Sequence, residues 1–189
     1  MKVTASSILQ KLRDRTGLQA LDLPTEAQWQ FAVTPGPLVG KTKVYRYRDP
    51  QGNLYNCGDV ARYSQNGGSD SPDLCDPDKG SACVGTYQPN ALGLYDMLGN
   101  VWEICLTPMV SLEKTKKWYV DNGVKFPIVD PLGLDQDTSK ELNGNLRIVA
   151  RGGGYANAAD YSTLWYRKGT FLTYSDGSAY GFRFCLTCE

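Results

Sequence analysis

Apolar residues near the start of the chain recur at helical spacing. Ile8, Leu9 and Leu12 fall on one helical face, after a Ser or Thr cap and before Gly17, a residue type that commonly ends helices. The pattern therefore predicts an amphipathic helix over about residues 5–16.

A second, shorter helix is predicted in the stretch LPTEAQWQFA. Thr25 and Gln28 have the spacing of a capping box, in which each side chain accepts a hydrogen bond from the other residue's backbone. Trp29, with Ala32 or Phe31, would face inward, and a proline three residues after Ala32 forbids continuation.

A hairpin and a long irregular segment are predicted next. From Lys41 the run KTKVYRYR alternates basic with apolar or aromatic residues, and DPQG supplies a turn before NLYN. The chain from Gly58 to Gly85 is rich in Gly, Ser, Asp and Pro, which predicts a long loop. Cys75 and Cys83 could staple this loop, and several nearby aspartates could bind calcium.

The remainder of the chain indicates β structure. After Gly133 a polar loop is predicted to lead into NLRIVARGG, where Leu146, Ile148 and Val149 indicate a buried strand. Further on, Tyr, Thr, Trp and Phe alternate with small residues, which is typical of short strands and turns. The predicted fold class is α+β, with helices early and irregular β structure late, in one domain.

Charge and composition exclude several classes of protein. Twenty Lys and Arg residues balance twenty Asp and Glu residues, so the chain lacks the positive field of a nucleic-acid or anionic-membrane binder. The basic run EKTKK is interpreted as solvated surface, and no apolar stretch approaches the roughly 20 residues that cross a bilayer. The chain has no histidine, which removes the usual general base and the commonest metal ligand. Its six cysteines are compatible with disulfides or with buried thiols.

Four motifs in one order carry a resemblance to a known family. They are LPTEAQWQFA, VGTYQPNALGLYDMLGNVWEIC, RGGGY and GFR, spread over about residues 5–185. Together they resemble the formylglycine-generating-enzyme family, also called sulfatase-modifying-factor domains. The resemblance implies a variant of the C-type lectin fold, with little regular secondary structure, two N-terminal helices and short antiparallel strands. Because the family's N-terminal portion is missing, we expect the chain to be the C-terminal part of a longer protein rather than a minimal version of the fold.

The resemblance also implies calcium sites. A hard cation prefers several oxygen ligands, and a tight turn can direct carbonyl groups at one point. The first implied site uses the side chains of Asp96 and Glu103 and the carbonyl groups of Gly99 and Val101. The second uses Asn56, the Cys57 carbonyl, Asp76 and the Asp78 carbonyl. The alternative for Asp96 and Glu103 is a hydrogen-bonded turn carboxylate and a surface charge.

The chain departs from the family at the catalytic positions. Family members that oxidise a substrate cysteine bind copper through two cysteines placed shortly after the R-G-G motif. No cysteine occurs here from Arg151 until Cys185, so neither the copper ligands nor the redox pair can be assembled. Relatives that use non-haem iron hold it with histidines, which this chain lacks. We therefore expect a protein that is not an enzyme and binds no copper.

A second group with this fold keeps the scaffold without catalysis, namely the variable proteins of diversity-generating retroelements. Their rewritten segment lies between an R-G-G-like start and a G-F-R-like end, and the same frame spans about residues 150–183 here. The segment is rich in Tyr and small polar residues, as antibody paratopes are, although its tyrosines could instead pack under loops. The candidate exposed binding residues are Gly154, Ala156, Asn157, Asp160, Tyr161, Tyr166, Lys168, Tyr174, Ser175, Asp176 and Tyr180. The predicted core residues are Trp165, Phe171 and Leu172, and the predicted framework residues are Arg151, Arg167, Phe182 and Arg183.

The leading hypothesis is a non-catalytic, monomeric binding protein displayed at a cell surface or elsewhere outside the cytoplasm. Its partner would be a protein or glycan ligand, with no nucleic acid and no insertion into a membrane by this chain. Two alternatives stay open: an oxidase of the formylglycine-generating type that works without the usual cysteine pair, and a scaffold protein whose tyrosine-rich face is a fixed interface.

Overall fold

The computed structural model of the chain describes residues 7–33, 56–67, 75–76, 78–125, 133–171 and 179–186. The predicted hairpin after Lys41, and the predicted positions of Leu172, Tyr174, Ser175 and Asp176, lie outside these residues. Within the described part, every helix falls short of the length and hydrophobicity that a bilayer crossing requires.

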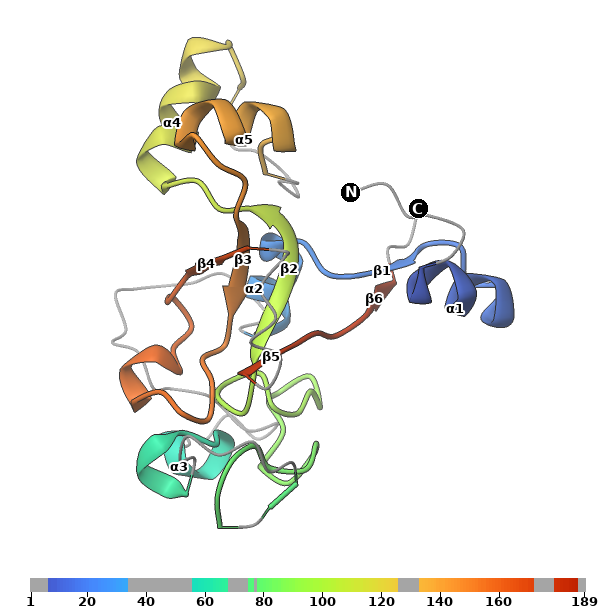
Figure 1. The fold of residues 1–189 in the computed structure, drawn as a ribbon, viewed down its shortest axis with the longest axis vertical. Coiled ribbons are helices and arrows are strands. Elements are labelled where there is room, and N and C mark those ends of the chain that lie inside the picture. The colour runs from blue at the N-terminus through green and yellow to red at the C-terminus, as the bar shows by residue number, and fades with distance from the viewer. Residues whose placement is uncertain are drawn as a thin grey trace.

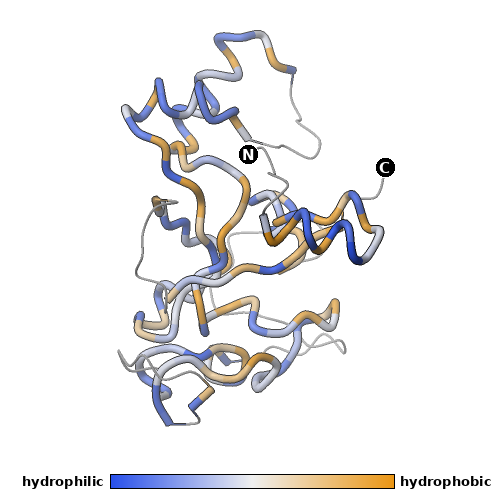
Figure 2. The backbone as a smooth tube through the Cα atoms, turned by 45° about the vertical axis from the view of Figure 1, so that its right-hand side comes forward, coloured by the Kyte–Doolittle hydropathy of each residue, from blue (hydrophilic) through white to orange (hydrophobic). Residues whose placement is uncertain are grey.

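Helix α1 (Ile8–Thr16) forms where the pattern predicts it. The Ser7 side chain accepts a hydrogen bond from the Gln10 N–H, and Gly17 ends the helix in a left-handed conformation at φ 74°. The helix buries none of its residues fully. Hydrophobic and hydrophilic residues accordingly alternate around its turns (Figure 2).

Helix α2 (Glu26–Val33) confirms the predicted capping box. The Thr25 N–H donates to Gln28 Oε1 at 2.8 Å, and the Gln28 N–H donates to Thr25 Oγ1 at 3.1 Å. The inward face carries Trp29, which is fully buried, whereas Phe31 points to solvent. Of the two predicted partners of Trp29, Ala32 is therefore the one that packs against the core.

A four-stranded sheet forms the centre of the molecule, with the strand order β4-β3-β2-β5 (Figure 1). Strand β3 pairs antiparallel with β2 and β4, and β5 pairs parallel with β2. The bounds are Trp102–Pro108 for β2, Ile148–Arg151 for β3, Lys168–Thr170 for β4 and Tyr180–Gly181 for β5. Because β3 is buried along its whole length, the strand predicted in NLRIVARGG is confirmed.

A separate two-stranded sheet joins the two ends of the described chain. Strand β1 (Leu21–Asp22) pairs antiparallel with β6 (Cys185–Leu186), and both lie beside α1, away from the central sheet (Figure 1). Arg13 of α1 reinforces this arrangement, since it donates to the Leu21 carbonyl at 2.7 Å and pairs with Asp22 at 3.1 Å.

Two helices occur that the sequence pattern does not predict. Helix α5 (Gln136–Asn143) replaces the polar loop expected after Gly133, and α4 (Leu112–Asp121) carries the basic run EKTKK on exposed positions. The two helices lie together at one end of the molecule, where Lys114 Nζ donates to the Leu142 carbonyl at 2.8 Å (Figure 1). Helix α5 has few apolar residues, so its capping residues specify it. The Asp135 side chain accepts a hydrogen bond from the Thr138 N–H at the start of the helix, and Gly144 ends the helix in a left-handed conformation.

The predicted irregular segment contains only short helical turns within the described residues, namely α3 (Cys57–Val60) and the 3₁₀ turn η1 (Ser64–Asn66). A further 3₁₀ turn, η2 (Ala159–Tyr161), lies in the C-terminal segment. The predicted staple is confirmed, because Cys75 and Cys83 form a disulfide.

The core lies between α2 and the sheet. Its buried members include Trp29, Val60, Met97, Leu98, Cys105 and Val149. Trp165 was predicted to belong to this core, but it is 42% exposed. The preceding residue, Leu164, takes the interior position instead, because the chain bends at residues 162–165 and the bend directs Leu164 inward and Trp165 outward. Phe171 is half-buried.

Candidate ligand-binding surface

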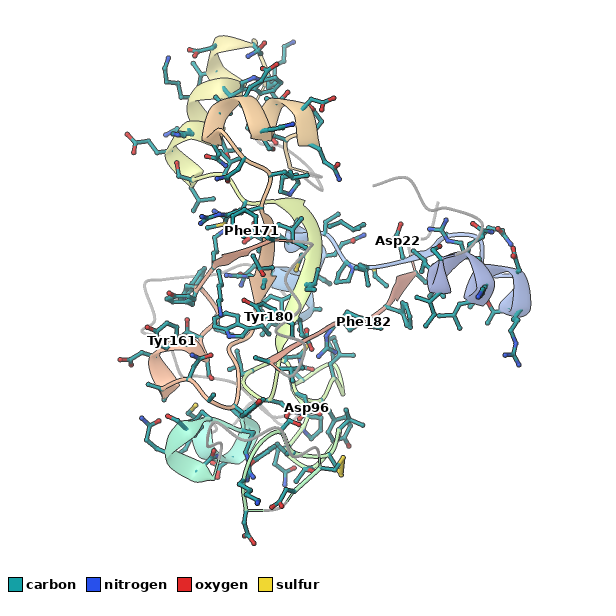
Figure 3. The ribbon with its side chains drawn as sticks, in the orientation of Figure 1. Asp22, Asp96, Tyr161, Phe171, Tyr180 and Phe182 are labelled. Carbon is teal, nitrogen blue, oxygen red and sulfur yellow. A yellow bond between two sulfur atoms is a disulfide. The ribbon has the colours of Figure 1, made fainter. Side chains whose placement is uncertain are left out.

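Four aromatic rings and one lysine gather on one face of the central sheet. We call this set the tyrosine–lysine patch, and it consists of Trp102, Tyr161, Tyr166, Lys168 and Tyr180. The rings of Tyr161 and Tyr166 lie 4.8 Å apart between centroids, and those of Trp102 and Tyr166 lie 5.8 Å apart. Lys168 Nζ lies 4.9 Å from the ring centroids of both Trp102 and Tyr180. Figure 3 labels Tyr161 and Tyr180, which approach this region from η2 and β5.

The strand register explains why these side chains meet. Tyr180 lies opposite Trp102 in the β2–β5 pair, and Lys168 lies opposite Ala150 in the β3–β4 pair. Ala150 in turn lies opposite Ile104, two residues after Trp102. Since directly paired residues and residues two apart share a face, Trp102, Lys168 and Tyr180 must all point to the same side.

Trp102 is the buried floor of the patch. It is only 1% exposed, and its Nε1 donates to Asn157 Oδ1 at 2.8 Å. Tyr161 and Tyr166, which pack against it, are 37% and 39% exposed. Trp102 is not among the binding residues predicted from the sequence. Because successive residues of a strand point to opposite faces, its place directly before Glu103 in the GNVWE motif could have put it on the face opposite that carboxylate.

The structure brings six of the predicted binding residues into this region: Asn157, Asp160, Tyr161, Tyr166, Lys168 and Tyr180. Ala156 is half-buried beside them. Gly154 was expected to be exposed, but it is buried because its backbone lies against Trp102; a Cβ atom there would meet the indole at 3.0 Å.

Predicted framework arginines fix the loop that carries the tyrosines. Arg151 donates to the carbonyl groups of Tyr166 at 2.6 Å and Leu164 at 2.7 Å. Arg167 forms a two-pronged ion pair with Glu26 at 2.6 and 2.7 Å. These contacts confirm the framework role of both arginines. Phe182, in contrast, is 53% exposed and contacts Phe184 on the surface.

The R-G-G-G motif is required by close backbone approach. Gly152 and Gly153 adopt φ angles of 92° and 89°, a region that side-chain-bearing residues rarely occupy. A Cβ atom on Gly153 would lie 2.8 Å from the Ser162 Cα and 2.9 Å from its backbone nitrogen. The glycines therefore let the chain that follows Arg151 pack closely against the backbone of Ser162, just after η2.

The predicted calcium carboxylates have different surroundings. Glu103 is 5% exposed, and its Oε2 accepts from Trp29 Nε1 at 2.6 Å and from Arg183 Nε at 2.6 Å. Asp96 Oδ2 accepts from the Gly85 N–H at 2.7 Å, whereas its buried Oδ1 has no hydrogen-bond partner among the described residues. Burial raises the pKa of the Asp96 carboxyl, and the Gly85 N–H and the Arg183 charge oppose that shift.

These surroundings suit a cation at Asp96 better than at Glu103. The open Oδ1 of Asp96 is an acceptor that a cation would satisfy, but Arg183 already neutralises the Glu103 carboxylate. At the second implied site, Asp76 Oδ1 accepts from the N–H groups of Asp78 and Lys79, and Asn56 caps α3. In the described residues, no three carboxylate or cysteine side chains converge as a metal cluster, so both calcium sites stay predictions.

The chain belongs to the family of the sulfatase-modifying factor enzyme 1-like domain, whose family model matches residues 5–187. It is similar to the formylglycine-generating enzyme of Streptomyces coelicolor, with 29% identity over 124 residues, which cover 65% of this chain and 34% of that enzyme. The predicted C-type-lectin-like fold of the formylglycine-generating subtype is therefore confirmed.

Two solved structures have the same fold. Treponema denticola variable protein 1 superposes with a TM-score of 0.56 and 24% identity, over 88% of this chain and 48% of that protein. PvdO from Pseudomonas aeruginosa superposes with a TM-score of 0.57 and 20% identity, over 93% of this chain and 56% of that protein. The chain thus spans about half the length of these structures and about a third of the Streptomyces enzyme.

We expect Gly153→Ala to destabilise the protein more than Gly144→Ala. Both glycines have positive φ, but an added Cβ has nothing within 4 Å at Gly144 and clashes with the Ser162 backbone at Gly153. The shared conformational cost is about 1–2 kcal/mol, and the clash should add about 1–3 kcal/mol at Gly153. Urea unfolding of the two variants measures the difference, and equal midpoints would contradict this account of the motif.

For calcium, we expect a chelator to lower the melting temperature and Asp96→Ala to abolish that effect. The physical reason is that a bound cation would satisfy the buried Asp96 Oδ1. Differential scanning fluorimetry with and without chelator makes the comparison, and Asp121→Ala on the exposed part of α4 serves as the control. A melting curve that the chelator leaves unchanged refutes the site.

Proposed function

We propose that this protein is a non-catalytic binding protein and that the tyrosine–lysine patch is its recognition surface. The observation that carries the proposal is the convergence of residues from β2, η2, β4 and β5 into one partly exposed group. Several of these residues are distant in sequence, and the segment between RGGG and GFR supplies all of them except Trp102.

The chemistry of the patch suits recognition of a protein or glycan. Tyrosine gives a large amphipathic contact area at the cost of few torsional degrees of freedom, as in antibody paratopes. Lys168 is held between two aromatic rings, so its charge is positioned before any ligand arrives. The amide oxygen of Asn157 accepts from Trp102, and Asp160, an exposed residue next to Tyr161 on η2, brings a carboxylate to this part of the surface.

The state of the thiols supports a non-catalytic role over the oxidase alternative. The segment after RGGG has no cysteine until Cys185, and the chain has no histidine. Burial raises the pKa of Cys57 to about 11 and raises that of Cys105 still further. Both thiols would therefore stay protonated near neutral pH, whereas metal binding and redox attack need the thiolate.

We further propose that the segment is diversified by a retroelement and displayed outside the cytoplasm, with the molecule acting as a monomer. The fold shared with a variable protein is compatible with this proposal. The Cys75–Cys83 disulfide favours an oxidising compartment. Tyr161 and Tyr166 are partly exposed, so their substitution should cost less stability than that of the buried Trp102 beneath them, as a diversified surface requires.

Sequence variation among copies of the gene distinguishes a diversified surface from a fixed interface. We expect differences to concentrate at positions such as Tyr161, Tyr166 and Lys168, while Arg151 and Arg183 stay constant because they hold the framework. Sequencing the copies together with any adjacent template repeat is the measurement. Differences spread evenly along the chain would show that the diversification idea is wrong.

Tolerance to substitution tests the surface itself. The triple variant Tyr161→Ser, Tyr166→Ser, Lys168→Ser should keep a cooperative transition and lose about 1–2 kcal/mol, because these side chains are partly exposed. Trp102→Ala should cost about 3–5 kcal/mol, because it removes a buried ring. Thermal unfolding followed by circular dichroism compares them, and a triple variant as unstable as Trp102→Ala would make the patch part of the core.

A library at the same positions then tests recognition. A displayed library with variants at Tyr161, Tyr166 and Lys168 is screened against an array of glycans and proteins. It should yield binders whose ligand specificity depends on which residues occupy these three positions. A matched library on the outer face of α4, at Glu113, Lys117 and Val120, is the control. Equal yields from the two libraries would count against a dedicated recognition surface.

A further inference from the structure

A cavity of about 570 Å³ lies on the α2 side of the central sheet, bounded by α2, the end of β2 and α4. Arg151 lines it and follows Ala150 along β3, so the cavity and Lys168 are on opposite faces of the sheet. Figure 1 shows α2 behind the sheet and α4 at the end of β2. The cavity is thus separate from the tyrosine–lysine patch, and its size is that of a small-molecule site.

The walls of the cavity are mainly apolar. Leu134 and Val110 are buried within them, and Trp165 closes one side with 42% of its surface exposed. Ala27 of α2 leaves space because its side chain is small, and Pro108 forms the adjoining part of β2. A ligand here would bury an aromatic or branched hydrocarbon body.

Among the described residues that line the cavity, the polar end carries more positive than negative charge. Both carboxylate oxygens of Glu26 accept hydrogen bonds from Arg167, so this carboxylate is already paired. Arg151 is 2% exposed, its Nε lies 3.6 Å from Glu26 Oε1, and its Nε–H has no hydrogen-bond acceptor among the described residues. The guanidinium groups of Arg151 and Arg167 therefore share the one carboxylate of Glu26. The exposed Lys116 on the rim adds a further positive charge.

A second anion would correct this imbalance. Burial lowers the pKa of Arg151, which shows that its charge is poorly solvated, and Glu26 compensates that effect only in part. A buried charge is costly unless it is paired and hydrogen-bonded. The terminal nitrogens of Arg151 already donate to the carbonyl groups of Tyr166 and Leu164 and to Gln30 Oε1, so Nε is the nitrogen that has no acceptor among the described residues and could donate to a ligand carboxylate.

We propose that this cavity binds an organic monocarboxylate with an aromatic or branched apolar body, its carboxylate toward Arg151 and its body between Ala27 and Trp165. The site is additional to the recognition surface and does not depend on it. A carboxylate next to an apolar group occurs both in a free organic acid and in the C-terminal residue of a peptide. The test distinguishes these two sources.

The test measures binding of 3-phenylpropionate and its neutral analogue 3-phenylpropanamide by ligand-observed NMR and calorimetry, using the wild-type chain. We expect the acid to bind at least about ten-fold more tightly than the amide, the factor that one charge-assisted hydrogen bond supplies. A short peptide ending in phenylalanine, compared with its C-terminal amide, shows whether a chain terminus binds more tightly than the free acid.

Two variants on the same helix locate the site. Ala27→Trp should fill the cavity and abolish binding, whereas Phe31→Trp adds an indole on the exposed side of α2 and should leave it unchanged. Should Ala27→Trp fail to fold, Ala27→Leu should give a partial loss, with thermal melting as the check of folding. The triple variant of Tyr161, Tyr166 and Lys168 should bind the acid normally.

Each of the following outcomes would overturn the proposal: no binding of either probe, equal binding of acid and amide, or acid binding that survives in a folded, cavity-filled variant. A loss in the triple variant would also overturn it, since it would place the acid on the tyrosine–lysine patch. Tighter binding of the carboxylate form than of its amide, for the free acid or for the peptide, supports the site. The relative affinity of free acid and peptide shows which of the two the cavity binds better.

Discussion

The buried carboxylate of Glu103 is the constraint on which the rest of the structure depends. It accepts hydrogen bonds from Trp29 of α2 and from Arg183 of the segment between β5 and β6, so three distant parts of the chain meet at one group. A buried charge requires such partners, and removing one would leave the others unsatisfied. Because neighbouring residues of a strand point to opposite faces, holding Glu103 inward obliges Trp102 to face the other way. The position of Trp102, the floor of the tyrosine–lysine patch, thus follows from an ion pair in the core.

The central sheet thereby separates two different environments. On one face, rings and a lysine form a partly exposed group over Trp102, and on the other, two guanidinium groups and an apolar cavity adjoin α2. Arg151 connects the two faces, because it lines the cavity and holds the carbonyl group of Tyr166. The glycines after Arg151 permit the close packing that this connection needs. The contacts that fix the loop carrying Tyr161 and Tyr166 are thus made by backbone groups and by the arginines.

Sequence patterns predicted the elements that depend on local chemistry. The capping box of Thr25, the disulfide between Cys75 and Cys83 and the apolar strand β3 are each recognisable within a few residues. Helices α4 and α5 were missed because their sequences are short and polar on average, and their caps and mutual contact define them. The positions of Trp165 and Gly154 were also misjudged, since burial there depends on the turn after Leu164 and on the approach of Trp102.

The sequence alone determined the family, the RGGG and GFR motifs that bound the C-terminal segment, and the absence of a cysteine pair between them, because these are properties of residue type and order. Only the tertiary structure decided which side chains gather. The pairing of β2 with both β3 and β5 brought Trp102, Lys168 and Tyr180 to one face, and no local pattern specifies that register. The cavity beside Arg151 likewise arises from packing between α2, β2 and α4, since long-range contacts create the space and the charge imbalance together.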